Sequence, residues 1–115
     1  MIENRTRQAR LADQAEVARG PLRRGLGLMG RRGWSDWDGL VLDRCGSIHT
    51  FFMRMPIDVV YLDRQGTVLR ADPAVPPWRV GPIVRRARTV LELPVGTIAR
   101  TGTQPGDSVT LPASA

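Results

Sequence analysis

The segment from Ile57 to Leu62 limits the fold of this chain more than any other part of the sequence. Five of its six residues are apolar, and most are β-branched or aromatic, which is typical of a β-strand. Because successive side chains of a strand point to opposite faces, both faces of this strand are apolar. We therefore predict a central strand that is covered on both sides. Asp58 interrupts it, and burying a polar group without partners costs about 1–3 kcal/mol, so its carboxylate must be paired.

Shorter apolar segments bounded by glycine and proline predict further strands. We expect these strands at residues 39–43, 48–53, 67–70, 89–93 and 108–111. The sequence Asp63-Arg64-Gln65-Gly66 is a turn signal, so the strand before it and the strand after it are predicted to form a β-hairpin. Several prolines between residues 73 and 82 predict a non-regular, largely extended connection.

Two short helices are expected. Pro21 can open a helix over residues 21–29, which the glycines that follow would end. A second helix is predicted over residues 96–101, with Thr97 able to cap its start and Gly102 ending it. Residues 8–18 are compatible with either a helix or a strand.

Together these elements predict a mainly β fold, namely a small distorted β-sandwich or barrel with two short helices. The chain of 115 residues is long enough for one domain with a core of its own. We assign residues 20–112 to this single globular domain and residues 1–19 to an N-terminal arm that could form an edge strand.

Composition limits the cellular setting and the chemistry. No apolar run approaches the roughly 18 residues of a membrane span, and the N-terminus shows no apolar core of a signal peptide. We therefore expect a cytoplasmic protein without a membrane partner. The single cysteine, Cys45, excludes an internal disulfide and a cysteine-based metal cluster within one chain. We expect no cofactor.

The net charge of +6 invites a nucleic-acid interpretation, but the charge pattern gives it weak support. All 17 basic residues are arginine, which fits a GC-rich coding bias as well as it fits phosphate binding. The arginines are spread along the chain, as on an ordinary solvated surface. Weak arginine-mediated nucleic-acid binding therefore remains only an alternative.

His49 and Asp58 are the candidate site residues with the most chemistry. In one interpretation Asp58 accepts backbone N–H groups or an arginine and fixes the bend after Pro56. In the other it lines a pocket with His49, and an adjacent carboxylate would raise the pKa of this histidine and fix its tautomer. Ser47, Thr50 and Met53 lie in the same segment and would contribute to such a pocket.

Complete catalytic sets are missing from this segment. A Ser47/His49/Asp58 hydrolase lacks the Gly-x-Ser-x-Gly elbow, and nothing orients a Cys45–His49 dyad. One histidine, one cysteine and carboxylates make a poor zinc site, and a phosphate-binding loop that needs lysine is impossible here.

The three tryptophans are expected to plug the edge of a small core. For Trp78 there is an alternative, because with Arg79 it could present a stacking and guanidinium surface to a ligand.

Ordered blocks of sequence resemble an uncharacterised bacterial and archaeal family, domain of unknown function 192, over residues 20–112. The blocks are Arg24, Gly27-Leu28-Met29-Gly30-Arg31, Gly39-Leu40-Val41-Leu42, Ser47-Ile48-His49-Thr50-Phe51-Phe52-Met53, Pro56-Ile57-Asp58-Val59-Val60-Tyr61-Leu62-Asp63, Gly66-Thr67-Val68-Leu69, Trp78-Arg79, Ala87, Val90-Leu91-Glu92-Leu93-Pro94-Val95-Gly96 and Gly106-Asp107. The resemblance implies a compact, distorted β-sandwich or barrel with short helices, and it implies no activity. The arm before residue 20 matches the family poorly.

Our leading hypothesis is a small non-enzymatic binding or accessory module with a pocket near residues 47–58. Its ligand is an unknown small molecule or protein partner, and the oligomeric state is left open. The candidate binding residues are Arg24, Met29, Ser47, His49, Thr50, Met53, Asp58 and Trp78. An enzyme that uses His49 and Asp58 as an acid–base pair is the alternative from another functional class.

Overall fold

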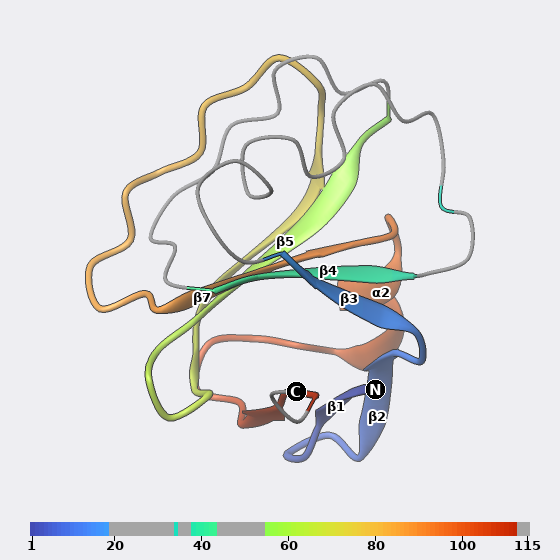
Figure 1. Cartoon of the computed structure of the whole chain (residues 1–115), viewed down its shortest axis with the longest axis vertical. Coiled ribbons are helices and arrows are strands. Elements are labelled where there is room, and N and C mark those ends of the chain that lie inside the picture. The colour runs from blue at the N-terminus through green and yellow to red at the C-terminus, as the bar shows by residue number, and fades with distance from the viewer. Residues whose placement is uncertain (19–33, 35–37, 44–54, 113–115) are drawn as a thin grey trace.

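The computed structural model describes residues 1–18, 34, 38–43 and 55–112. In these ranges the chain forms two β-sheets and one short helix, α2 (Thr97–Thr101) (Figure 1). The strands are β1 (Ile2–Asn4), β2 (Ala9–Ala12), β3 (Ala15–Ala18), β4 (Gly39–Asp43), β5 (Ile57–Leu62), β6 (Val68–Val75), β7 (Thr89–Leu93) and β8 (Val109–Thr110). The predicted mainly β, sandwich-like fold is confirmed.

The larger sheet has five strands in the order β3-β4-β7-β5-β6, and all neighbours are antiparallel except the parallel pair β3 and β4. β5 lies between β7 and β6, and all six of its residues are buried. This confirms the predicted central strand. β4 and β7 occupy the residues expected for them.

The smaller sheet has the order β2-β1-β8 and brings both ends of the described chain together. β1 is its central strand, and Ile2 is fully buried. The ambiguous residues 8–18 form β2 and β3, each at the edge of a sheet. The N-terminal arm therefore carries edge strands and also a central one. The division between residues 1–19 and 20–112 stays a prediction.

The predicted hairpin of β5 and β6 is confirmed, and its turn depends on two residues. Asp63 Oδ1 accepts the backbone N–H groups of Gln65 and Thr67, both at 2.9 Å. Gly66 has a φ of 84°, and a Cβ there would lie 2.5 Å from the carbonyl oxygen of Val109. Only glycine combines this backbone angle with such a close approach.

β6 continues to Val75, so the predicted irregular connection from residue 73 was wrong for its first residues. The strand tolerates Pro73 because β6 is the edge of the sheet, where a missing N–H leaves no ladder bond unmade. The register of β5 and β6 shifts between Ile57 and Val59, and Ala74 has a φ of 50°.

Helix α2 is confirmed, but its predicted start was wrong. Gly96 is the N-cap, and the Thr97 hydroxyl instead donates to the carbonyl oxygen of Pro94 at 2.7 Å. Gly102 ends the helix as predicted, with a φ of 71° and its N–H donated to the carbonyl oxygen of Ile98 at 2.9 Å. The expected helix over 21–29 and the expected strand over 48–53 lie outside the described residues.

Side chains of the five-stranded sheet pack into two apolar clusters, one on each face. The inner core lies between the two sheets and contains Ile2, Leu11, Ala12, Val41, Val60, Leu62, Val68, Leu91, Leu93 and Val109. The outer core lies on the opposite face and contains Leu40, Leu42, Met55, Ile57, Val59, Tyr61 and Val90. Alternation along each strand separates the two sets. Asp58 shares the inner face with Val60, and Glu92 shares the outer face with Val90.

Candidate functional site

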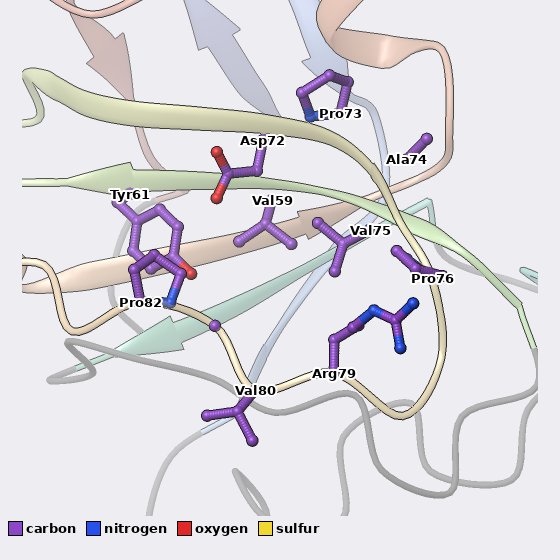
Figure 2. Close-up of a pocket in the computed structure, with 11 residues that line it drawn as sticks. Val59, Tyr61, Asp72, Pro73, Ala74, Val75, Pro76, Arg79, Val80 and Pro82 are labelled. Atoms are coloured by element: carbon purple, nitrogen blue, oxygen red, sulfur yellow. The ribbon is translucent and has the colours of Figure 1, made fainter.

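A cavity of about 290 Å³ opens on the outer face of the larger sheet (Figure 2). β5 and β6 form one wall, and the segment that follows β6 arches over it to form the other. The lining residues are Val59, Tyr61, Asp72, Pro73, Ala74, Val75, Pro76, Arg79, Val80, Gly81 and Pro82. The lining is predominantly apolar, as is typical of sites that hold small molecules.

Local backbone chemistry keeps the two walls apart. Ala74 and Trp78 have φ values of 50° and 63°, a conformation that is uncommon for residues other than glycine. The prolines at 73, 76 and 82 fix further φ angles and remove N–H groups that would otherwise need partners. The connection therefore bends over the outer core instead of continuing along the sheet.

Two charged side chains give the cavity its polarity. The Asp72 carboxylate accepts from Arg70 Nε at 2.9 Å to each of its oxygens, and its side chain is 24% exposed. Arg79 lies on the opposite wall and carries a guanidinium group with up to five N–H donors. An apolar body with one positively charged wall suits a small ligand that carries an anionic group.

Asp58 lies behind this cavity and not in it. Its Oδ1 accepts the N–H of Ala74 at 2.9 Å, and its Oδ2 accepts the N–H of Ile98 at 2.8 Å. The structural interpretation of Asp58, as a buried acceptor of backbone N–H groups, is confirmed. Since Ala74 lines the cavity, Asp58 ties the cavity wall to the start of α2 and acts as a positioning residue.

Glu92 is a buried carboxyl that the sequence analysis missed. It is 5% exposed and lies on the outer face, in register with Leu40 of β4 and Val59 of β5. Burial raises the pKa of Glu92 to about 7, with no hydrogen bond from another described residue to offset it. The argument applied to Asp58, a carboxylate within an apolar strand, would have identified Glu92 too.

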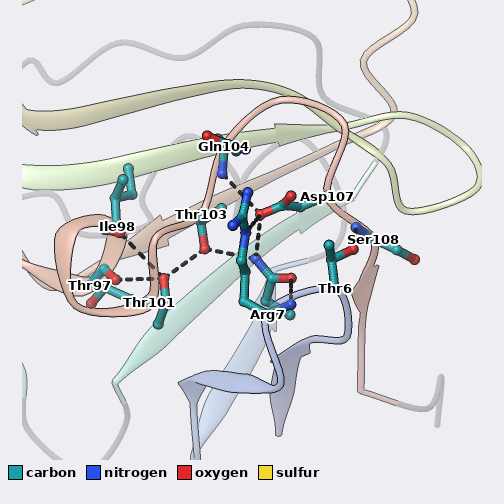
Figure 3. Close-up of polar contacts among 10 residues, drawn as sticks. Thr6, Arg7, Thr97, Ile98, Thr101, Thr103, Gln104, Asp107 and Ser108 are labelled. Atoms are coloured by element: carbon teal, nitrogen blue, oxygen red, sulfur yellow. Dashed lines mark hydrogen bonds and ion pairs between the residues drawn. The ribbon is translucent and has the colours of Figure 1, made fainter.

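A polar cluster joins the N-terminal segment to the residues that follow α2 (Figure 3). Asn4 Nδ2 donates to Thr103 Oγ1 and to Asp107 Oδ2, each at 3.0 Å, and Arg7 Nε donates to the same Asp107 oxygen at 3.0 Å. Burial alone would raise the pKa of Asp107, but bonds from Arg7, Asn4 and the Gln104 N–H lower it below its ordinary value. These groups satisfy one another, so the cluster holds β1 to the C-terminal segment.

The predicted site residues are only partly within the described ranges. Arg24, Met29, Ser47, His49, Thr50 and Met53 lie outside them, so the pairing of His49 with Asp58 stays a prediction. Trp34 packs against the outer core, as expected of an edge plug. Trp78 does not, because it is 56% exposed; it precedes Arg79 in the segment that covers the cavity.

Neither a metal site nor a membrane-spanning helix is found in the part of the chain that the structure describes. No group of three or more metal-ligating side chains comes together there. No helix in these ranges has the length and apolar character needed to cross a bilayer.

Three comparisons place this geometry among known proteins. The model of the DUF192 family, described as "Uncharacterized ACR, COG1430", matches residues 2–111. A UPF0127 protein of Pyrococcus abyssi is 38% identical over 63 residues, which cover 55% of this chain and 53% of that protein. This match therefore spans about half of the relative's length.

Two crystal structures share the fold. One is a protein of unknown function from Novosphingobium aromaticivorans, with a TM-score of 0.76, 25% identity and coverage of 84% of this chain and 74% of that one. The other is a putative transcription regulator from Sinorhizobium meliloti, with a TM-score of 0.72, 28% identity and coverage of 84% and 79%. Their descriptions name no ligand and no reaction.

Proposed function

This chain belongs to the DUF192 family. The descriptions of the matched family and of the similar proteins name no ligand and no reaction. From the geometry of this chain we therefore propose that the protein is a non-enzymatic binding or accessory module. Its ligand is a small molecule with an apolar body and one anionic group. The observation that carries the proposal is the cavity of about 290 Å³ with Arg79 in one wall.

Size and lining define the class of ligand. Ligand sites commonly measure about 300–1,000 Å³, so this cavity is near the lower limit and suits a small molecule. Proline and valine side chains would remove the ligand body from water. Arg79 can donate two parallel N–H bonds to a carboxylate or phosphate.

Asp72 supplies the selectivity in this proposal. Its charge is paired with Arg70 and lies on the wall opposite Arg79. A second anionic group on the ligand would meet this carboxylate, and like charges at close range cost free energy. We therefore expect monoanionic ligands to bind more tightly than dianionic ones of similar size.

The candidate residues outside the described ranges stay part of the proposal. The chain re-enters the described ranges at Met55, which is 7% exposed within the outer core beside the cavity-lining Val59. This supports keeping His49 and Met53 as candidates for completing the binding site. A cytoplasmic location stays a prediction.

The acid–base enzyme is the weaker hypothesis. Both oxygens of Asp58 already accept backbone N–H groups, which makes this carboxylate a poor partner for a proton-transferring histidine. A binding module needs no carboxylate that exchanges protons with a histidine. It needs a cavity, which the described residues already form.

Ligand screening with matched variants tests the proposal. Native mass spectrometry and NMR shift mapping would be run with a panel of small apolar carboxylic acids and phosphate monoesters. Arg79→Gln should weaken binding roughly tenfold or more, since a charge-assisted bond contributes about 1.5–3 kcal/mol. The control is Arg64→Gln, an exposed arginine in the hairpin turn.

A second pair of variants tests the cavity itself. Val75→Phe fills the cavity from a half-buried position in its wall, while Val95→Phe adds the same side chain at a 50% exposed site elsewhere. Loss of binding in the first variant alone supports the cavity. Binding that survives both Val75→Phe and Arg79→Gln contradicts the proposal.

A further inference from the structure

We propose that residues 76–88, the apolar–basic loop, dock onto an anionic lipid surface, a function beyond ligand binding in the cavity. This loop connects β6 to β7 and extends away from the sheet as the yellow-to-orange segment at the left of Figure 1. Trp78, Val80 and Ile83 are 56%, 71% and 86% exposed on it. These three residues are among the most exposed large apolar side chains in the described ranges.

The charge of the loop is one-sided. Between Pro73 and Leu91 there are four arginines and no acidic residue, and the arginines are Arg79, Arg85, Arg86 and Arg88. Arg88 lies 3.9 Å from an Asp43 oxygen, too far for a strong ion pair, and both side chains are 42% exposed. All charged residues in this part of the chain are therefore positive.

The apolar and basic groups lie within one short stretch of the chain. Trp78 and Ile83 are five residues apart, so their Cα atoms are separated by at most about 18 Å. A turn closed by the Ala87 N–H and the Val84 carbonyl oxygen orders the arginine end of the loop. The Arg88 N–H then donates to the Leu62 carbonyl oxygen at 2.8 Å, which anchors the loop to the end of β5. A preordered loop loses little conformational entropy on docking.

A lipid surface fits this combination better than other anionic partners. Tryptophan prefers the headgroup region, aliphatic side chains insert below it, and arginines bind the anionic headgroups. Nucleic acid would use the arginines and Trp78 but would leave Val80 and Ile83 exposed to water. Three side chains on one loop also supply less area than the roughly 800 Å² per partner of a standard protein interface.

This docking mode requires no membrane span. The expectation of no membrane partner was based on the lack of a long apolar segment, and a loop that rests in the headgroup region needs only a few apolar side chains plus basic ones. Neither Ile83 nor the pair Arg85 and Arg86 lines the cavity, so variants of these residues leave the proposed ligand site in place.

Vesicle co-sedimentation tests the inference. We expect the protein to sediment with vesicles of phosphatidylcholine containing about 30% phosphatidylserine, and far less with phosphatidylcholine alone, at about 0.1 M salt. Arg85→Gln with Arg86→Gln should lower partitioning by about 25-fold, because each arginine near such a surface contributes about fivefold. Trp78→Ser with Ile83→Ser should lower it by tenfold or more.

Matched controls separate docking from general charge and hydrophobicity. Arg5→Gln with Arg64→Gln removes the same charge elsewhere on the surface, and Val95→Ser removes a 50% exposed apolar side chain outside the loop. Both should retain partitioning within about twofold to fivefold. Equal losses in control and loop variants overturn the proposal, as does equal binding to both kinds of vesicle.

The rival partner has its own outcome. A labelled single-stranded oligonucleotide is tested in a mobility assay with the same variants. The lipid proposal is wrong, and the loop is a nucleic-acid contact, if two results are obtained together. The first is that the oligonucleotide shifts in the mobility assay and that Arg85→Gln with Arg86→Gln abolishes this shift. The second is that no variant changes vesicle partitioning.

Discussion

Replacing Glu92 by glutamine should stabilise the protein above neutral pH and have little effect in acid. The unfolded chain titrates this carboxyl near its ordinary pKa of 4.5, whereas burial raises the pKa in the folded protein to about 7. Between these values the folded state holds a proton that the unfolded state has lost, so stability falls as pH rises. Below 4.5 both states are protonated and the group contributes nothing to the pH dependence.

The size of the effect follows from the two pKa values. They differ by two and a half units, and each unit corresponds to about 1.4 kcal/mol, so the full cost well above pH 7 is about 3–4 kcal/mol. Glutamine has a similar shape and no charge, and it removes this cost. The free energy of unfolding of Glu92→Gln minus that of wild type should therefore grow by about 3 kcal/mol from about pH 4.5 to pH 8.

Urea unfolding at several pH values measures this difference directly. Titrations of all other groups occur in both proteins and cancel in the subtraction, provided that the slopes of the unfolding curves agree. Glu3→Gln, which removes an exposed carboxylate on β1, is the matched control. A flat difference for Glu92→Gln across the same range would refute the assignment of Glu92 as a carboxyl that is costly to ionise.

Two further predictions concern the elements that shape the fold. Asp58→Ala leaves the backbone N–H groups of Ala74 and Ile98 without their acceptor and should lower the free energy of unfolding by about 2–5 kcal/mol. Asp13→Ala, which removes an exposed ion pair, should cost less than about 1 kcal/mol, and equal losses in denaturant melts would contradict the positioning role of Asp58. Gly66→Ala should destabilise the protein more than Gly106→Ala. Both residues have a positive φ, but only at Gly66 would an added Cβ meet the carbonyl oxygen of Val109. Equal shifts in melting temperature would show that the backbone around Gly66 moves to accommodate the Cβ without a cost in stability.

Features that depend on local chemistry could be predicted from the sequence. The β5–β6 hairpin follows from a strand with two apolar faces and from a turn that ends in glycine, and Gly102 ends α2 for an equally local reason. The burial of Asp58 and its need for hydrogen-bond donors also follow from the strand pattern alone. Each of these depends on residues within a few positions of one another.

Features that depend on distant partners could not be predicted. β1 is central because β2 and β8 happen to flank it, and Pro73 is tolerated because β6 has no further neighbour in the larger sheet. The cavity arises from the way residues 76–82 cross back over β5, and no periodicity of the sequence encodes that path. Sequence reasoning therefore recognised Arg79 as a possible contact but could not place it opposite Asp72.

The two buried carboxyls of the larger sheet lie on opposite faces and differ in their surroundings. Asp58, on the inner face, accepts two N–H bonds and so stabilises the contact between β6 and α2. Glu92, on the outer face, is costly to ionise at neutral pH and lies in register with Val59, which in turn pairs with Asp72 in the wall of the cavity. Perturbed acids concentrate near binding and catalytic sites, where their cost is offset by function. This places a protonatable group one strand away from the proposed ligand, so ligand binding and the charge state of Glu92 should be coupled.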